Sequence, residues 1–175
     1  MLKIAMVSSS LVLALAVAAS PLRAQQDKSK RPSPPATANC ELAGGKTVTI
    51  DYSSPRKKGR NVFPDVVKYG EVWRTGANEA TVFEVNKDVT VGGKKLPAGK
   101  YSLFSIPSEK EWTFILNKKS DLWGTDGYSE TDDAVRVVAQ PAKSPQFTEK
   151  MTFAVNEAGA VSLLWGDVQV GFNVD

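Results

Sequence analysis

Histidine is absent from this 175-residue chain, and cysteine occurs only once. The absence of imidazole excludes Ser–His and Cys–His nucleophile pairs, histidine acid–base catalysis and nearly all zinc and copper sites. The chemistries that remain are those of carboxylates, lysine and tyrosine, oxygen-ligated Ca²⁺ or Mg²⁺, and binding without catalysis. The single thiol, Cys40, excludes an intrachain disulfide, and we expect it to be buried or inert.

Long apolar runs are also scarce, and the one that exists lies at the N-terminus. Lys3 precedes an apolar segment at residues 4–19, and residues 22–24 (Leu-Arg-Ala) end in a small side chain. This order is typical of a secretory signal peptide, and the run is shorter than the roughly 20 residues of a membrane anchor, which is the alternative. We therefore expect cleavage after residue 24, a periplasmic or extracellular location, and no membrane span in the mature chain.

The mature chain also has little net charge. Removal of residues 1–24 takes Lys3 and Arg23 away, so 22 basic residues against 19 acidic ones become 20 against 19. A chain this close to neutral gives no argument for nucleic-acid binding. Residues 25–39 are rich in proline and basic side chains, which predicts a disordered tether. Residues 40–175 then have a suitable length for one domain.

Short segments of alternating apolar and polar residues recur along this domain, with turn signals between them. The clearest is Gly92–Gly93, flanked by two short apolar runs in the pattern of a type I′ hairpin. Gly166–Asp167 predicts a second hairpin between the last two strands, and Phe147 is expected on the apolar face of its strand with Met151. The expected strands lie at residues 46–52, 80–86, 89–96 (a hairpin), 101–107, 112–117, 134–139, 146–155, 161–165 and 168–174.

About eight short strands without an amphipathic helix predict an all-β fold. We expect an antiparallel β-sandwich, with a jelly-roll-like arrangement as one form of it and a closed β-barrel as the alternative. The longest unpatterned segment, residues 118–133, is rich in aspartate. Because it lacks the spacing of an EF-hand calcium loop, we expect a surface loop, with neither a metal site nor a cofactor.

The chemistry of the chain is concentrated in residues 69–81, which follow no clean strand or helix period. Arg74 is the sharpest candidate, because its guanidinium grips a carboxylate or phosphate with two parallel hydrogen bonds. The alternative is that Arg74 pairs with Glu71 or Glu79 and locks the loop. The candidate binding residues are Arg74, Asn78, Glu79, Tyr69 and Trp73, and we expect the two aromatic side chains to serve packing more than ligand stacking.

Several strings in the chain resemble one bacterial family, catalogued as domain of unknown function 2911. The resemblance covers about residues 46–175. It implies an exported bacterial protein with a β-rich domain, and it implies no reaction and no catalytic residues. The strings that carry it lie at residues 51–55, 58–60, 69–81, 91–104 and 112–117.

Three functions remain open from the sequence. The first is a non-catalytic binding module for a small polar ligand, such as a sugar or a peptide. The second is a structural or assembly protein of the cell envelope, with an envelope protein as its partner. The third is a hydrolase with paired carboxylates, in which Glu79 acts with Glu71, Glu84 or Asp51.

Overall fold

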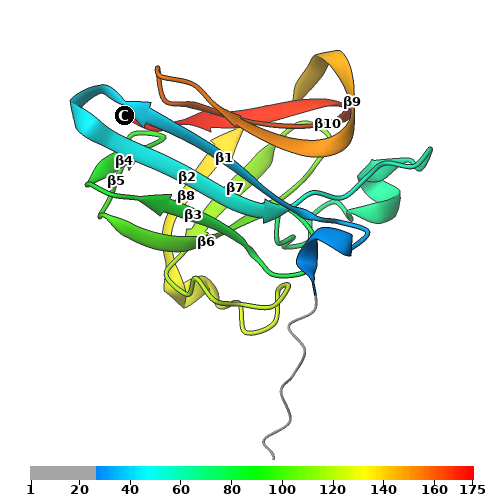
Figure 1. The fold of residues 1–175 in the computed structure, drawn as a ribbon, viewed down its shortest axis with the longest axis horizontal. Helices are drawn as coiled ribbons and strands as arrows, with labels where there is room; N and C mark the ends of the chain where they lie inside the picture. The colour runs from blue at the N-terminus through cyan, green and yellow to red at the C-terminus, as the bar shows by residue number, and fades with distance from the viewer. Residues whose placement is uncertain (1–26) are drawn as a thin grey trace, which may run out of the picture.

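The computed structural model describes residues 27–175, so the expected signal peptide lies outside the described residues. The described chain is built almost entirely from antiparallel strands (Figure 1). Its short helical turns are η1 (Lys28–Lys30), η2 (Ala43–Gly45), η3 (Val62–Val66) and η4 (Glu130–Asp132). Over residues 27–175, no helix is long and apolar enough to cross a membrane.

One sheet of six strands dominates the molecule, and its order is β1-β2-β3-β6-β7-β8. Two separate hairpins, β4–β5 and β9–β10, complete the described fold. The strands are β1 (Pro35–Leu42), β2 (Lys46–Ser53), β3 (Thr81–Val85), β4 (Val89–Val91), β5 (Lys94–Leu96), β6 (Gly99–Ile106), β7 (Trp112–Asn117), β8 (Asp133–Ala139), β9 (Ala142–Val155) and β10 (Ala160–Asn173).

This arrangement confirms the expected antiparallel β-sandwich. The sheets do not close into a barrel, and the β9–β10 hairpin lies across the upper side of the large sheet in Figure 1. Strand order in the large sheet follows chain order, apart from the excursion into β4 and β5. The sheet is therefore an up-and-down meander without the Greek-key connections that define a jelly roll.

The main core lies between the large sheet and the β9–β10 hairpin. Alternate residues of each strand face it, and the registers Ile50↔Phe83 and Phe83↔Tyr101 show three neighbouring strands contributing to one layer. Tyr52 ties the two layers together: its ring packs edge-on against Phe153, and its hydroxyl accepts a hydrogen bond of 3.2 Å from the Phe153 amide. This face buries most of the apolar side chains of the described chain.

One end of the core is an aromatic cluster of Phe63, Trp73, Trp112 and Trp165. Phe63 packs edge-on against all three indoles, with centroid separations from 5.1 to 6.2 Å. Trp73 stacks on Trp165 at 6.0 Å, and all three indoles are at most 8% exposed. Offset and edge-on contacts of this kind are the favoured geometries for aromatic rings.

The N-terminal part of the domain differs from the sequence expectation. Residues 35–39, expected in a disordered tether over residues 25–39, form the first part of β1, which pairs with β2 along its whole length. Ala36, Ala38 and Cys40 alternate along β1 and pack against the main core. Small side chains suffice here because β1 is an edge strand, and so the segment carries no strong apolar signal. The domain therefore begins before Cys40.

The C-terminal part differs in a second way. The expected turn at Gly166–Asp167 lies inside β10, which runs without a break and pairs with β9. The register shifts on both sides of Gly166, and Gly166 has a φ of +64°, so glycine marks a bulge there. Phe147, expected to face inward with Met151, is 58% exposed, whereas Met151 is fully buried. A register shift between the two residues changes which face each presents.

The opposite face of the large sheet is covered only in part. A small cluster of Ala80, Phe104 and Ile115 is buried there, with Leu122 and Tyr128 of the loop after β7 packed against it. This loop and the N-terminal turn η1 lie on the same side of the sheet as the small cluster. The space between them is where the candidate site lies.

Candidate functional site

The second half of the sequence motif is held in a short backbone ladder with the loop after β7. The Ala80 amide donates to the Leu122 carbonyl at 3.0 Å, and the Gly124 amide donates to the Asn78 carbonyl at 3.2 Å. These two bonds flank the bridge between Glu79 and Trp123. The two residues are thus a non-hydrogen-bonded antiparallel pair, the kind in which opposing side chains lie closest on one face.

Glu79 is the best-anchored polar group of the motif. Its carboxylate accepts two hydrogen bonds from Arg31 Nη1, at 3.0 and 2.9 Å, and lies 3.0 Å from Lys28 Nζ. Partial burial raises the pKa of Glu79, but hydrogen bonds from its own amide, Lys28 and Arg31, together with the charge of Lys28, outweigh this effect and bring the pKa to about 2. The carboxylate is therefore ionised at any physiological pH.

Asn78 fastens the same N-terminal segment at a second point. Its Nδ2 donates to the Ser33 carbonyl at 3.0 Å, and its φ of +59° lies in the left-handed region, which asparagine tolerates better than most residues. Glu79 and Asn78 together hold residues 28–33 against the ladder. Two neighbouring motif residues thus act as an anchor for the start of the described chain.

Arg74 does not pair with Glu71 or Glu79, which was the alternative to ligand binding. Among residues 27–175 it forms no ion pair, and its Nε atom is buried without a hydrogen-bond partner. The guanidinium reaches beneath the loop after β7, where a Cβ atom on Gly124 would lie 3.8 Å from Nη1. Burial lowers the pKa of Arg74.

The two aromatic candidates serve packing. Trp73 is 8% exposed within the aromatic core cluster, and its Nε1 donates to the Gly76 carbonyl at 3.1 Å. Tyr69 is half-buried and stacks on Phe63 at 6.4 Å, with the rings 6° from parallel. Burial, followed by the charge of Glu109, raises the pKa of Tyr69. Both rings thus pack against aromatic side chains at this end of the core.

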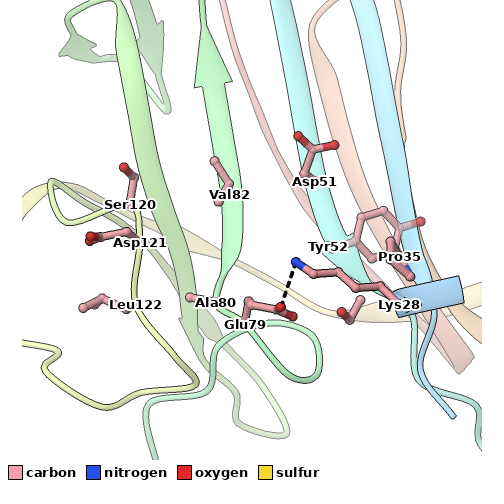
Figure 2. A pocket seen from close by; sticks show the side chains of 11 residues that line it. Lys28, Pro35, Asp51, Tyr52, Glu79, Ala80, Val82, Ser120, Asp121 and Leu122 are labelled. Carbon is pink, nitrogen blue, oxygen red and sulfur yellow. Dashed lines mark ion pairs between the residues drawn. The ribbon is translucent and has the colours of Figure 1, made fainter. Parts of the chain in front are cut away.

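A cavity of about 300 Å³ opens beside Glu79 (Figure 2). Its walls come from η1, β2, the start of β3 and the loop after β7. Of the five candidate binding residues, Glu79 lines it, whereas Arg74, Asn78, Tyr69 and Trp73 do not. Asp51, one of the carboxylates considered as a hydrolytic partner of Glu79, also lines it. The lining residues are Lys28, Pro35, Asp51, Tyr52, Ser53, Glu79, Ala80, Val82, Ser120, Asp121 and Leu122.

The polar groups of the cavity have different surroundings. Asp51 and Asp121 stand on opposite sides of Val82 in Figure 2, while the Lys28 ammonium reaches the Glu79 carboxylate between them. Asp51 accepts a hydrogen bond from the Thr37 hydroxyl at 2.5 Å. Within residues 27–175, no three carboxylate or thiol groups gather closely enough to hold a metal ion. The cavity instead offers separated donors and acceptors over an apolar floor.

Sequence reasoning missed several groups that build this site. Lys28 and Arg31 belong to a segment expected to be disordered, and Asp121 and Trp123 belong to a loop expected to be solvated. Trp123 is 57% exposed, unlike the other three tryptophans. The one available signal was a tryptophan in an otherwise polar, aspartate-rich loop, because exposed aromatic side chains concentrate at binding surfaces.

The fold and the cavity define a class: an antiparallel β-sandwich with a small polar cavity on the less covered face of its main sheet. The chain belongs to the family described as Protein of unknown function (DUF2911), whose family model matches residues 33–174. That match begins just before β1 and includes almost the whole described domain. No curated protein and no solved structure shows a significant match to the chain.

Proposed function

We propose that this protein is an exported, non-catalytic binding module that holds a small polar ligand in the cavity beside Glu79. The observation that carries the proposal is the cavity itself. Its volume of about 300 Å³ lies at the lower end of the range for small-ligand sites, and it combines an apolar floor with a few separated polar groups. The apolar segment at residues 4–19, with its signal-peptide order, supports export.

The low pKa and the ion pairs of Glu79 favour ligand binding over hydrolysis. A general acid or base works best with a pKa near the working pH, whereas the pKa of Glu79 is about 2. Two cations hold its carboxylate, so it is an acceptor of fixed position and fixed charge. Such a group suits the orientation of a ligand better than proton transfer.

A structural role in the cell envelope is the second candidate, and the contacts to the N-terminal segment favour it. Asn78 and Glu79 hold residues 28–33 through the Ser33 carbonyl and the side chains of Arg31 and Lys28, which is what a loop devoted to architecture would do. The two roles differ in one respect. A structural role needs no cavity, whereas a binding role needs it open.

Blocking the cavity tests the proposal. Mature protein (residues 25–175) labelled with ¹⁵N is titrated with individual monosaccharides, amino acids and dipeptides while amide shifts are followed. We expect at least one compound to shift amides of residues 79–82 and 120–124 in a saturable way. Val82 lines the cavity floor, so Val82→Phe is expected to abolish these shifts.

Thr49→Phe is the matched control. Thr49 is also a half-buried strand residue on the same face of the sheet, two positions before Asp51 on β2, but it lies outside the cavity lining. It is expected to retain binding. Absence of saturable shifts with every compound, or equal binding by Val82→Phe and wild type, would leave the structural role as the better account.

A further inference from the structure

The four tryptophans of the chain fall into two groups. Trp73, Trp112 and Trp165 are 8%, 1% and 1% exposed and form the aromatic core cluster, whereas Trp123 is 57% exposed. An indole left in water loses the free energy that burial of its large apolar surface would supply. Packing of the described chain therefore does not account for the position of Trp123.

The ladder between residues 78–80 and 122–124 fixes where this indole stands. Glu79 and Trp123 are a non-hydrogen-bonded pair, so their side chains leave the ladder on the same face as close neighbours. Glu79 lines the cavity, and so do the two residues before Trp123, Asp121 and Leu122. Trp123 is not itself a lining residue, but its backbone, held by hydrogen bonds on both sides, lies next to the lining residues Leu122 and Glu79.

From this placement we infer that the ligand of the cavity is a sugar and that Trp123 is the platform on which its ring stacks. The inference rests on the proposed binding function and names its ligand class. A sugar ring has an apolar C–H face, which suits a flat exposed indole, and a circumference of hydroxyl groups that both donate and accept hydrogen bonds.

The polar lining suits such a ligand. Lys28 supplies donors, Asp51 and Asp121 supply acceptors on opposite walls, and Ser120 supplies a hydroxyl that does both. A small cation would be better served by carboxylates gathered at one point. Here Glu79 is already neutralised by Lys28 and Arg31, and Asp51 and Asp121 lie apart.

A buried hydroxyl behind the cavity floor adds an independent observation. Ser102 of β6 is the register partner of Val82, so the two side chains share one face of the sheet. Ser102 is fully buried, and its Oγ has no hydrogen-bond partner within residues 27–175. Buried hydroxyl groups normally have a partner, so this one indicates an unmet hydrogen bond beside the cavity.

The test compares two sets of compounds on the mature chain. The sugars are glucose, galactose, mannose, N-acetylglucosamine, cellobiose and N,N′-diacetylchitobiose. The other polar compounds are lysine, glutamate, spermidine and triglycine. Binding is followed by the indole N–H resonance of Trp123 and by amide shifts of residues 79–82. We expect saturation by at least one sugar, with the Trp123 resonance among those that shift most.

Substitutions at two residues of similar exposure, Trp123 and Phe147, separate the platform role from a general effect of losing an exposed aromatic ring. Trp123→Ala is expected to weaken binding of that sugar by about tenfold, and Trp123→Phe by less, because the smaller ring retains a stacking face. Phe147→Ala removes another exposed ring, 58% exposed on β9 and outside the cavity lining, and should bind as wild type.

The outcomes separate the two claims. Saturation by lysine, glutamate, spermidine or triglycine alone would overturn the sugar assignment and leave the binding function in place. Sugar binding that Trp123→Ala leaves unchanged would overturn the platform role. No saturable shift with any compound would overturn the sugar assignment together with the proposed function.

Discussion

The two faces of the six-stranded sheet are covered in different ways. The face toward β9 and β10 is closed by a second layer and filled with apolar side chains, including Trp112 and Trp165 at 1% exposure each. The other face has a buried cluster of only three residues, a loop and a helical turn, with a cavity between them. One sheet thus has a face that supplies stability and a face with room for a ligand.

The difference separates the part of the molecule that stabilises the fold from the proposed binding site. Side chains of the filled face interdigitate, so any change of volume there alters the free energy of unfolding. Side chains of the open face are held by a few hydrogen bonds and ion pairs between loops, where single changes cost less. Substitutions on the open face should therefore alter binding without loss of the fold.

The largest predicted effect concerns the filled face. Trp112 packs against Phe63 at 5.1 Å and Trp73 at 6.2 Å, so Trp112→Ala leaves a large void. We expect a loss of about 3–5 kcal/mol of unfolding free energy, measured by urea denaturation. If this variant does not fold, Trp112→Phe provides a smaller void and a measurable loss.

The control for this comparison is Val82→Ala, a large-to-small change beside the cavity. We expect it to cost about 1 kcal/mol or less, because Val82 is only half-buried and borders open space. Equal losses for Trp112→Phe and Val82→Ala would show that the two faces contribute to stability in the same way.

The second prediction concerns the anchor at Asn78. Asn78→Ala removes the hydrogen bond to the Ser33 carbonyl and places alanine at a φ of +59°, for an expected loss of about 1–2 kcal/mol. Asn78→Gly removes the same bond but tolerates the backbone angle, so it should cost about half as much. Urea denaturation of both variants separates the cost of the lost hydrogen bond from the cost of the strained backbone angle. A larger loss for Asn78→Gly than for Asn78→Ala would contradict this assignment.

The third prediction is a pH dependence that belongs to the open face. The pKa of Glu79 in the folded protein, about 2, lies below its ordinary value of 4.5, so the unfolded chain binds a proton first as pH falls. The stabilisation is therefore complete above about pH 4.5 and is lost as pH falls toward 2. Because the side chain is 36% exposed, we expect it to amount to about 1 kcal/mol or less.

Glu79→Gln isolates this contribution. The variant should be slightly less stable than wild type at pH 7, and the difference should shrink by pH 3 and vanish below pH 2. Unfolding free energies from urea titrations at these pH values provide the measurement. A difference that stays constant from pH 7 to pH 2 would show that the ion pairs with Lys28 and Arg31 contribute nothing.

The filled face was the more predictable of the two. Alternation of apolar residues placed β7 at its observed bounds, residues 112–117, and Gly92–Gly93 correctly predicted the β4–β5 turn, where both residues have positive φ. Period-two burial is a local property that a sequence records directly. The alternation pattern failed to predict the first part of β1, because the inward residues there are too small to produce the signal. It also failed at Gly166, because glycine is favoured both in a β-bulge and in a turn.

The candidate site was less predictable because its contacts join distant parts of the chain. The motif at residues 69–81 drew attention to Glu79, but the partners of that carboxylate, Lys28 and Arg31, lie about 50 residues earlier. No local pattern records such a pairing. The position of Trp123 opposite Glu79 depends likewise on how a long loop folds back, which composition alone does not determine.

The smallest predicted effect concerns Arg74, which the sequence marked as the sharpest candidate. Its Nε is buried without a partner among residues 27–175, and burial lowers its pKa, so part of the guanidinium is desolvated without a protein partner. Arg74→Met keeps the length and apolar stem of the side chain and removes the unpartnered polar group. We expect the unfolding free energy to stay within about 0.5 kcal/mol of wild type or to rise slightly. A loop lock would require Arg74→Met to lower the melting temperature by several degrees, about 1 kcal/mol for a domain of this size. Thermal denaturation of the two proteins decides between these outcomes. A loss of about 1 kcal/mol of unfolding free energy would show that Arg74 helps Asn78 and Glu79 to hold the loop in place.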